Sequence, residues 1–180
     1  MISITEGKFI FTFPDNWEVI KYDDSHFFKN HIRKSQGCKA VDILALSDNC
    51  LFLIEIKDFR GYRIESKKSI RNDEILNEVV QKVRDTIMGL YAAYRRTNEE
   101  LAPFYRYLCT TSKYSTLAAR HQRKIIVVWF IEQDIQPNFE FSPISLRVKL
   151  KNQLKFLNIN CLVHNKETYA KKPLGWFVVG

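Results

Sequence analysis

The sequence predicts an α/β fold, a mixed β-sheet flanked by helices, in a single domain over residues 1–180. Three features indicate this fold. Two β-prone runs, 40–46 and 51–57, are separated by a polar turn and predict an antiparallel hairpin. A long segment, 75–94, repeats apolar residues at helical spacing. The continuous apolar run 124–131 suits a strand that is buried on both faces, as in the middle of a sheet.

The remaining elements follow in chain order. Apolar stretches on either side of Pro14-Asp15-Asn16 predict two strands around a turn. A short helix follows over 26–34, ending near Gly37. Beyond the strand at 124–131, we expect a basic amphipathic helix over 143–157 and one more strand over 159–164. The hairpin, helix, strand, helix, strand order is typical of mixed α/β domains.

Composition restricts the function. The chain has 28 Lys and Arg residues against 20 Asp and Glu, a formal net charge of +8, which favours a polyanionic partner such as nucleic acid. No apolar run is long enough to span a membrane and no secretory signal is recognisable, so we expect a cytoplasmic protein. The four cysteines form no C-x-x-C pair, and the histidines lack metal-ligand spacing. Phosphate-loop, dinucleotide-binding and serine-hydrolase motifs are absent.

The hairpin brings three charged residues together. If its turn at 47–50 contains an even number of residues, the numbers of paired residues sum to 97, and Asp42 faces Glu55. Opposed residues share one face of a sheet, and Lys57, two positions beyond Glu55, points to the same face. A slip of one residue would separate Asp42 from the other two. The alternative without a functional site is that Glu55 and Lys57 form an exposed ion pair that contributes little to stability, and that Asp42 merely ends a strand.

Two opposed carboxylates repel each other unless a cation lies between them. Mg²⁺ binds one or two carboxylates and completes its shell with water and phosphate oxygens, so it suits this pair, with Mn²⁺ as a substitute. The main-chain carbonyl of Ile56 is a further candidate ligand. Lys57 can then stabilise the charge that develops on a phosphate under attack by water.

Val41-Asp42 followed, after a gap, by Glu55-Ile56-Lys57 resembles the PD-(D/E)xK motif of restriction endonuclease-like nucleases, with Val41 in place of the proline. The resemblance is strongest over residues 38–95. It implies a restriction endonuclease-like mixed sheet with flanking helices, Asp42 and Glu55 as metal ligands, and Lys57 as the catalytic lysine of phosphodiester hydrolysis.

Two more positions match particular branches of the superfamily. RecB-like members carry a glutamine on the helix after the motif, and Gln81 lies there, although a solvated helix face also explains it. Resolvase-like members carry an acid about two dozen residues before the motif aspartate. Glu18 has that spacing, and Asp23 and Asp24 compete with it.

We therefore expect a Mg²⁺-dependent endonuclease with DNA as its substrate and RNA as the open alternative, acting in defence, as a toxin or in repair. The alternative is an inactive nuclease-fold protein that binds nucleic acid or another protein. A homodimer or a targeting partner protein is compatible with either. Basic residues directly after the motif are candidate phosphate contacts that position the substrate: Arg60, Lys67, Lys68 and Arg71.

Overall fold

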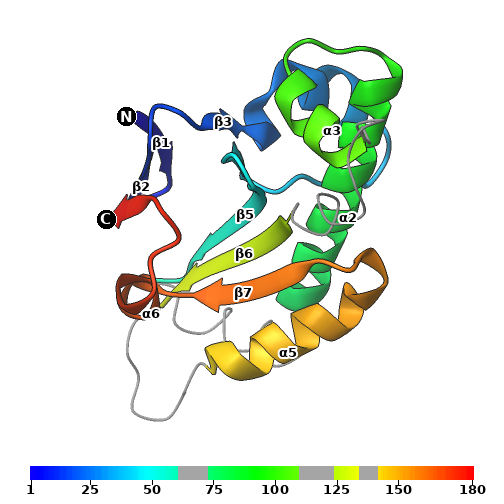
Figure 1. Cartoon of the computed structure of the whole chain (residues 1–180). Coiled ribbons are helices and arrows are strands. Elements are labelled where there is room, and N and C mark those ends of the chain that lie inside the picture. The colour runs from blue at the N-terminus through cyan, green and yellow to red at the C-terminus, as the bar shows by residue number, and fades with distance from the viewer. Residues whose placement is uncertain (61–72, 110–123, 134–141) are drawn as a thin grey trace, which may run out of the picture.

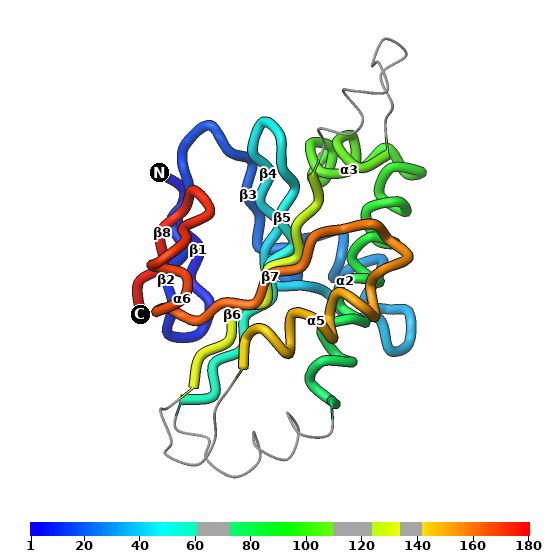
Figure 2. The backbone as a smooth tube through the Cα atoms, turned by 60° about the horizontal axis from the view of Figure 1, so that its bottom comes forward, coloured from blue at the N-terminus to red at the C-terminus, as the bar shows by residue number. Residues whose placement is uncertain are grey.

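The structure is a computed structural model that describes residues 1–60, 73–109, 124–133 and 142–180. It has the predicted α/β architecture (Figure 1). A large mixed sheet lies between a small sheet on one side and helices on the other, and these layers are separated clearly in Figure 2. The candidate site lies on the helical side of the large sheet.

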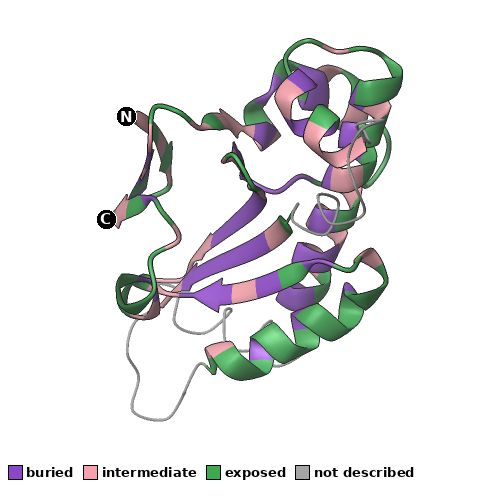
Figure 3. Ribbon diagram, in the orientation of Figure 1, coloured by how far each residue is buried: buried purple, intermediate pink, exposed green. Residues whose placement is uncertain are grey.

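Among the described residues, the large sheet has five strands in the order β3-β4-β5-β6-β7. β3 pairs with β4 and β4 with β5 in antiparallel orientation, whereas β5, β6 and β7 run parallel to one another. The predicted buried strand is β6, which lies between β5 and β7 and is purple over much of its length in Figure 3. The strand bounds are β3 Glu18–Lys21, β4 Ile43–Leu46, β5 Cys50–Asp58, β6 Lys124–Glu132 and β7 Asn160–His164.

The small sheet was not foreseen from the sequence. It is antiparallel in the order β1-β2-β8, with β1 Ile2–Glu6, β2 Phe9–Phe13 and β8 Phe177–Val179. The two strands predicted around Pro14 are therefore present as β2 and β3, but they belong to different sheets. Alternate residues of β2 point inward and are fully buried against the large sheet: Phe9, Phe11 and Phe13.

Helices cover the other face of the large sheet. The predicted long helix is α2, Glu74–Arg95, whose apolar stripe is buried. α5, Pro143–Gln153, packs beside it and continues as a 3₁₀ turn over Lys155–Leu157. The predicted helix at 26–34 is a π-helical turn over Phe28–Ile32. Two further helices of the described residues were not predicted: α3 Ala102–Cys109, which packs on α2, and α6 Lys166–Lys171, whose Tyr169 packs in the cluster on the small-sheet side.

The hairpin register is the one predicted. Leu44 pairs with Leu53 and Leu46 with Leu51, and the Ser47 amide donates to the Cys50 carbonyl at 2.9 Å, so paired numbers sum to 97. This even count places the side chains that precede β4 on the same face as their partners on β5. That face is the one covered by α2.

Candidate functional site: two buried carboxylates and two lysines

Asp42 immediately precedes β4 and is 6% exposed. Its Oδ2 accepts a hydrogen bond of 2.6 Å from the amide of Ile56 on β5, and its own carbonyl accepts one of 2.8 Å from the amide of Tyr22. Asp42 therefore continues the sheet beyond the end of the strand. Burial raises its pKa, against the opposing charge of Lys82 and the Ile56 hydrogen bond.

Glu55 lies at the same level on β5 and has no exposed surface. Burial, together with the charge of Asp42, raises its pKa to about 8. Its two oxygens differ. Oε1 contacts two ammonium groups, whereas Oε2 is buried without a hydrogen-bond partner among the described residues. An unsatisfied buried carboxylate oxygen is costly, so this atom is available to a ligand.

Lys57 points to the face that carries Glu55, as predicted. Its Nζ lies 3.4 Å from Glu55 Oε1 and 3.2 Å from Oε1 of Glu78 on α2. Burial tends to raise the pKa of Glu78, but the nearby lysines, Lys57 foremost, outweigh it and lower the pKa. A charged Glu78 thus holds the Lys57 ammonium beside the carboxylate pair.

Lys82 is the residue that the sequence reasoning missed. It extends from α2 toward the sheet, with Nζ 2.7 Å from Glu55 Oε1 and 3.5 Å from Asp42 Oδ1. Burial would lower its pKa, but the two carboxylates more than compensate and raise it. A positive charge consequently lies between the two acids, where the electrostatic argument requires a cation.

A polar ridge on α2 delivers these groups. Glu78, Lys82 and Thr86 are four residues apart and so lie on one side of the helix. Thr86 is fully buried, and its Oγ1 accepts a hydrogen bond of 3.1 Å from the amide of Val41. A proline at position 41, as in the family motif, has no amide hydrogen and could not form this bond. The four-residue spacing of polar residues beside the apolar stripe was the signal available in the sequence.

The structure separates the candidates for the N-terminal acid. Glu18 is exposed on β3 and pairs with Leu46, at the turn end of the hairpin, roughly 13 Å along the strands from Asp42. Asp24 is exposed and paired with Lys29. Asp23 is the acid beside the site: burial and then the charge of Asp42 raise its pKa to about 6, and its Oδ1 is buried without a described partner.

Gln81 does not reach the carboxylates. Its Nε2 donates a hydrogen bond of 2.6 Å to the carbonyl of Gly37, and the neighbouring Asp85 accepts one of 2.9 Å from the amide of Lys39. Gln81 therefore fastens the loop that leads to Asp42 onto α2. Its position one residue before Lys82 turns it about 100° away from the polar ridge.

Arg60 is engaged within the chain. Its Nε and Nη2 donate to the two carboxylate oxygens of Asp58 at 2.9 and 2.8 Å, and its guanidinium lies 4.4 Å from the centre of the Phe9 ring. The other predicted phosphate contacts, Lys67, Lys68 and Arg71, lie outside the described residues.

The donor set suits a hard divalent cation that keeps part of its water shell. Within the described ranges, no group of three or more His, Cys, Asp or Glu side chains converges as a metal site. Two carboxylates do converge, one with an unsatisfied oxygen, and the Ile56 amide points toward Asp42. In an extended strand the amide and the carbonyl of one residue point to the same side, so the Ile56 carbonyl also points toward Asp42. Two carboxylates and one carbonyl fit Mg²⁺ better than a softer metal.

Comparisons with known proteins assign no family. No family model matches the chain, and no solved structure matches it. A cysteine–tRNA ligase from Neisseria meningitidis is 31% identical over an alignment of 135 residues, and the match covers 59% of this chain and 19% of that protein. The chain therefore spans about a fifth of the length of this relative. Separately, no helix within the described ranges is long and apolar enough to cross a membrane.

Proposed function

We propose that the chain is a Mg²⁺-dependent phosphodiesterase that acts as a DNA endonuclease. The observation that carries the proposal is the burial of Asp42 and Glu55 at the same level of the sheet, with Lys57 on the same face. The carboxylates of Asp42 and Glu55 and the carbonyl of Ile56 would hold the metal. When bound, Mg²⁺ supplies Lewis-acid stabilisation of negative charge on the phosphoryl oxygens.

The chain's own groups have defined tasks in this reaction. Water attacks phosphorus, a new P–O bond forms, and the P–O bond to the leaving oxygen breaks. Lys57, positioned by Glu78, places a positive charge beside the phosphoryl oxygens as their negative charge increases. Asp42 is oriented by the Ile56 amide. Lys82 neutralises Glu55 when no metal is bound and so keeps two buried acids compatible with folding.

A plasmid assay tests the activity. Purified chain is incubated with supercoiled DNA and Mg²⁺ or Mn²⁺, alongside Asp42→Asn and Lys57→Ala, with Arg84→Gln as a control for an exposed cation on α2. We expect nicking by the wild type and the control, and a loss of at least about 100-fold in the two site variants. Equal nicking in all four proteins would contradict the assignment of nuclease activity to this site.

Two further experiments test an RNA substrate and a function in nucleic-acid binding without cleavage. A tRNA transcript is a suitable RNA substrate, because the partial relative is a cysteine–tRNA ligase. The competing function is a non-cleaving nucleic-acid-binding protein with this fold, favoured by the net charge of +8. It predicts salt-dependent binding without turnover, and no Mg²⁺ binding that Asp42→Asn removes in calorimetric titration.

A further inference from the structure

A separate pocket opens beside β7, the last strand of the large sheet among the described residues. It lies between the start of α5 and the far end of α6 and has a volume of about 260 Å³. β7 is two strands away from β5. His164 on β7 lies at the level of Ile56 on β5, so the two residues are roughly 10 Å apart across the sheet. The lining is Pro143, Ile144, Arg147, Val163, His164, Thr168, Lys171 and Lys172.

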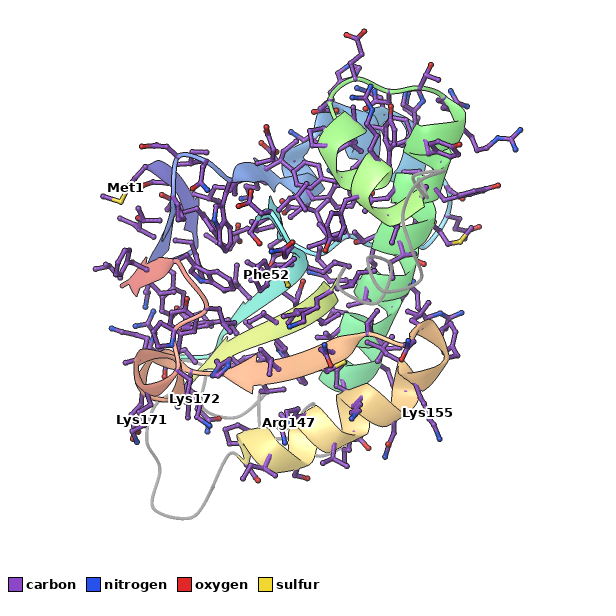
Figure 4. All side chains as sticks on the ribbon, in the orientation of Figure 1. Met1, Phe52, Arg147, Lys155, Lys171 and Lys172 are labelled. Atoms are coloured by element: carbon purple, nitrogen blue, oxygen red, sulfur yellow. The ribbon has the colours of Figure 1, made fainter. Side chains whose placement is uncertain are left out.

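The charged side chains that line this pocket are all positive among the described residues. Arg147 comes from α5, and Lys171 and Lys172 come from the end of α6, as Figure 4 shows. Lys171 is paired with Glu167 at 2.5 Å, but both side chains are exposed and such pairs are weak. Within the described part of the chain, Arg147 and Lys172 have no acidic side chain within ion-pair distance. An anion entering the pocket would therefore meet two uncompensated cations.

His164 supplies a buried polar group. It is 9% exposed, and its Nδ1 has no hydrogen-bond partner among the described residues. Its ring packs edge-on against Tyr169 with centroids 5.8 Å apart. Burial, followed by the charges of Lys172 and Arg147, lowers the pKa of His164, as expected when cations without counter-charge surround it. A buried ring nitrogen without a partner is rare and costly, which points to a ligand.

Apart from Thr168, whose hydroxyl donates to Asn165 Oδ1 at 2.8 Å, the rest of the lining is apolar and includes the start of a helix. Pro143 and Ile144 form the first turn of α5, whose N-cap Ser142 accepts a hydrogen bond from the Ser145 amide. The positive end of the helix dipole thus adds to the three cations. Val163 completes an apolar surface next to the charged part. A volume near the lower limit of ordinary small-molecule sites, about 300 Å³, suits a ligand with one phosphate and one flat apolar group.

We propose that this pocket binds a nucleoside monophosphate group, with the phosphate against Arg147, Lys172 and Nδ1 of His164, and the nucleoside against Pro143, Ile144 and Val163. The same chemistry is presented by a free mononucleotide and by the 5′-phosphorylated end of a strand. The inference is independent of the proposed hydrolysis, because none of these residues belongs to the carboxylate site.

The test is a titration of the full chain with 5′-AMP, adenosine, and an oligonucleotide with and without a 5′-phosphate. It uses EDTA and the Asp42→Asn background, so that neither metal binding nor cleavage affects the result. Arg147→Gln and Lys172→Gln are compared with Lys155→Gln, an exposed cation beyond α5 that does not line the pocket. Binding is followed by calorimetry and by the imidazole ¹⁵N resonances of His164, and thermal melts confirm that each variant is folded.

We expect saturable 5′-AMP binding that shifts the His164 resonances, that adenosine does not reproduce, and that each pocket variant weakens about tenfold or more. Lys155→Gln should bind as the wild type does. If the 5′-phosphate increases the affinity for the oligonucleotide, the natural ligand is the end of a strand. If 5′-AMP alone binds, the ligand is a free nucleotide. No saturable binding of either phosphorylated probe, or an equal loss in Lys155→Gln, overturns the proposal.

Discussion

The ammonium group of Lys82 on α2 lies 2.7 Å from Oε1 of Glu55 on β5, and Glu55 has no exposed surface. This ion pair joins the helical layer to the sheet in a place shielded from water. Removal of one member of a buried pair leaves an uncompensated charge, which costs more than the pair itself contributes. The pair therefore links the stability of the chain to the occupancy of the candidate metal site.

The first prediction concerns Lys82→Gln. In EDTA at a pH above about 8, where Glu55 is ionised, this variant should lose about 3–5 kcal/mol of unfolding free energy, because two buried carboxylates then face each other without a cation. Mg²⁺ should restore more stability to it than to the wild type, because no ammonium competes for Glu55. Urea denaturation with and without Mg²⁺ measures both effects, with Arg84→Gln as the exposed control on α2. An identical response of Lys82→Gln and Arg84→Gln would contradict this role.

A second prediction concerns pH. The pKa of Glu55 rises from an ordinary value of 4.5 to about 8 on folding, so the folded chain binds more protons than the unfolded chain across this range. The unfolding free energy in EDTA should therefore fall as pH rises from about 4.5 to about 8, by at most about 5 kcal/mol. Glu55→Gln should show a flatter profile, with the residual slope including the contribution of Asp23, whose pKa is also raised. Parallel profiles for the two proteins would refute the assignment of this slope to Glu55.

Asp42 should show separable structural and chemical roles. Asp42→Ala removes the acceptor of the Ile56 amide and should cost about 1–3 kcal/mol of unfolding free energy. Asp42→Asn keeps an acceptor oxygen, so it should fold nearly as well as the wild type in EDTA, yet lose the Mg²⁺-dependent increase in stability. Chemical denaturation gives the first difference and calorimetric titration with Mg²⁺ the second. Retention of Mg²⁺ binding by Asp42→Asn would remove Asp42 from the ligand set.

Asp23 and Glu18, the two N-terminal acids, allow a controlled comparison. Asp23→Asn should shift the midpoint of the Mg²⁺ titration of plasmid nicking at least about tenfold, because Asp23 lies close enough to Asp42 for their charges to interact. Glu18→Gln, on an exposed strand position far from the carboxylates, should change it by less than about twofold. The midpoint of the Mg²⁺ titration is the quantity to compare. A larger effect from Glu18→Gln would reverse this assignment.

Local rules were sufficient for the hairpin and the long helix. The turn at 47–50 fixes the register, and the register decides that Asp42, Glu55 and Lys57 share a face. The apolar stripe of α2 likewise follows from its spacing alone. In both cases the residues that determine the structure lie within a few positions of each other in the sequence.

The rest depends on contacts between distant segments. The four-residue spacing of polar residues on α2 marks Lys82 as a candidate, but a buried lysine and a solvated one look alike in a sequence, so its ion pair with Glu55 became evident only with α2 placed on the sheet. Spacing from the motif favoured Glu18, but the pairing of β3 with β4 brings Asp23 to the site instead. The small sheet escaped prediction because β8 pairs with β2 across almost the whole length of the chain.

That last pairing also has a kinetic consequence. Phe11 on β2 is paired with Val178 on β8, so the small sheet cannot close until residues at opposite ends of the sequence meet. Contacts of such large sequence separation slow folding, and they form late. Until then the three buried phenylalanines of β2 remain only partly covered, and a chain still emerging from the ribosome would present them to chaperones.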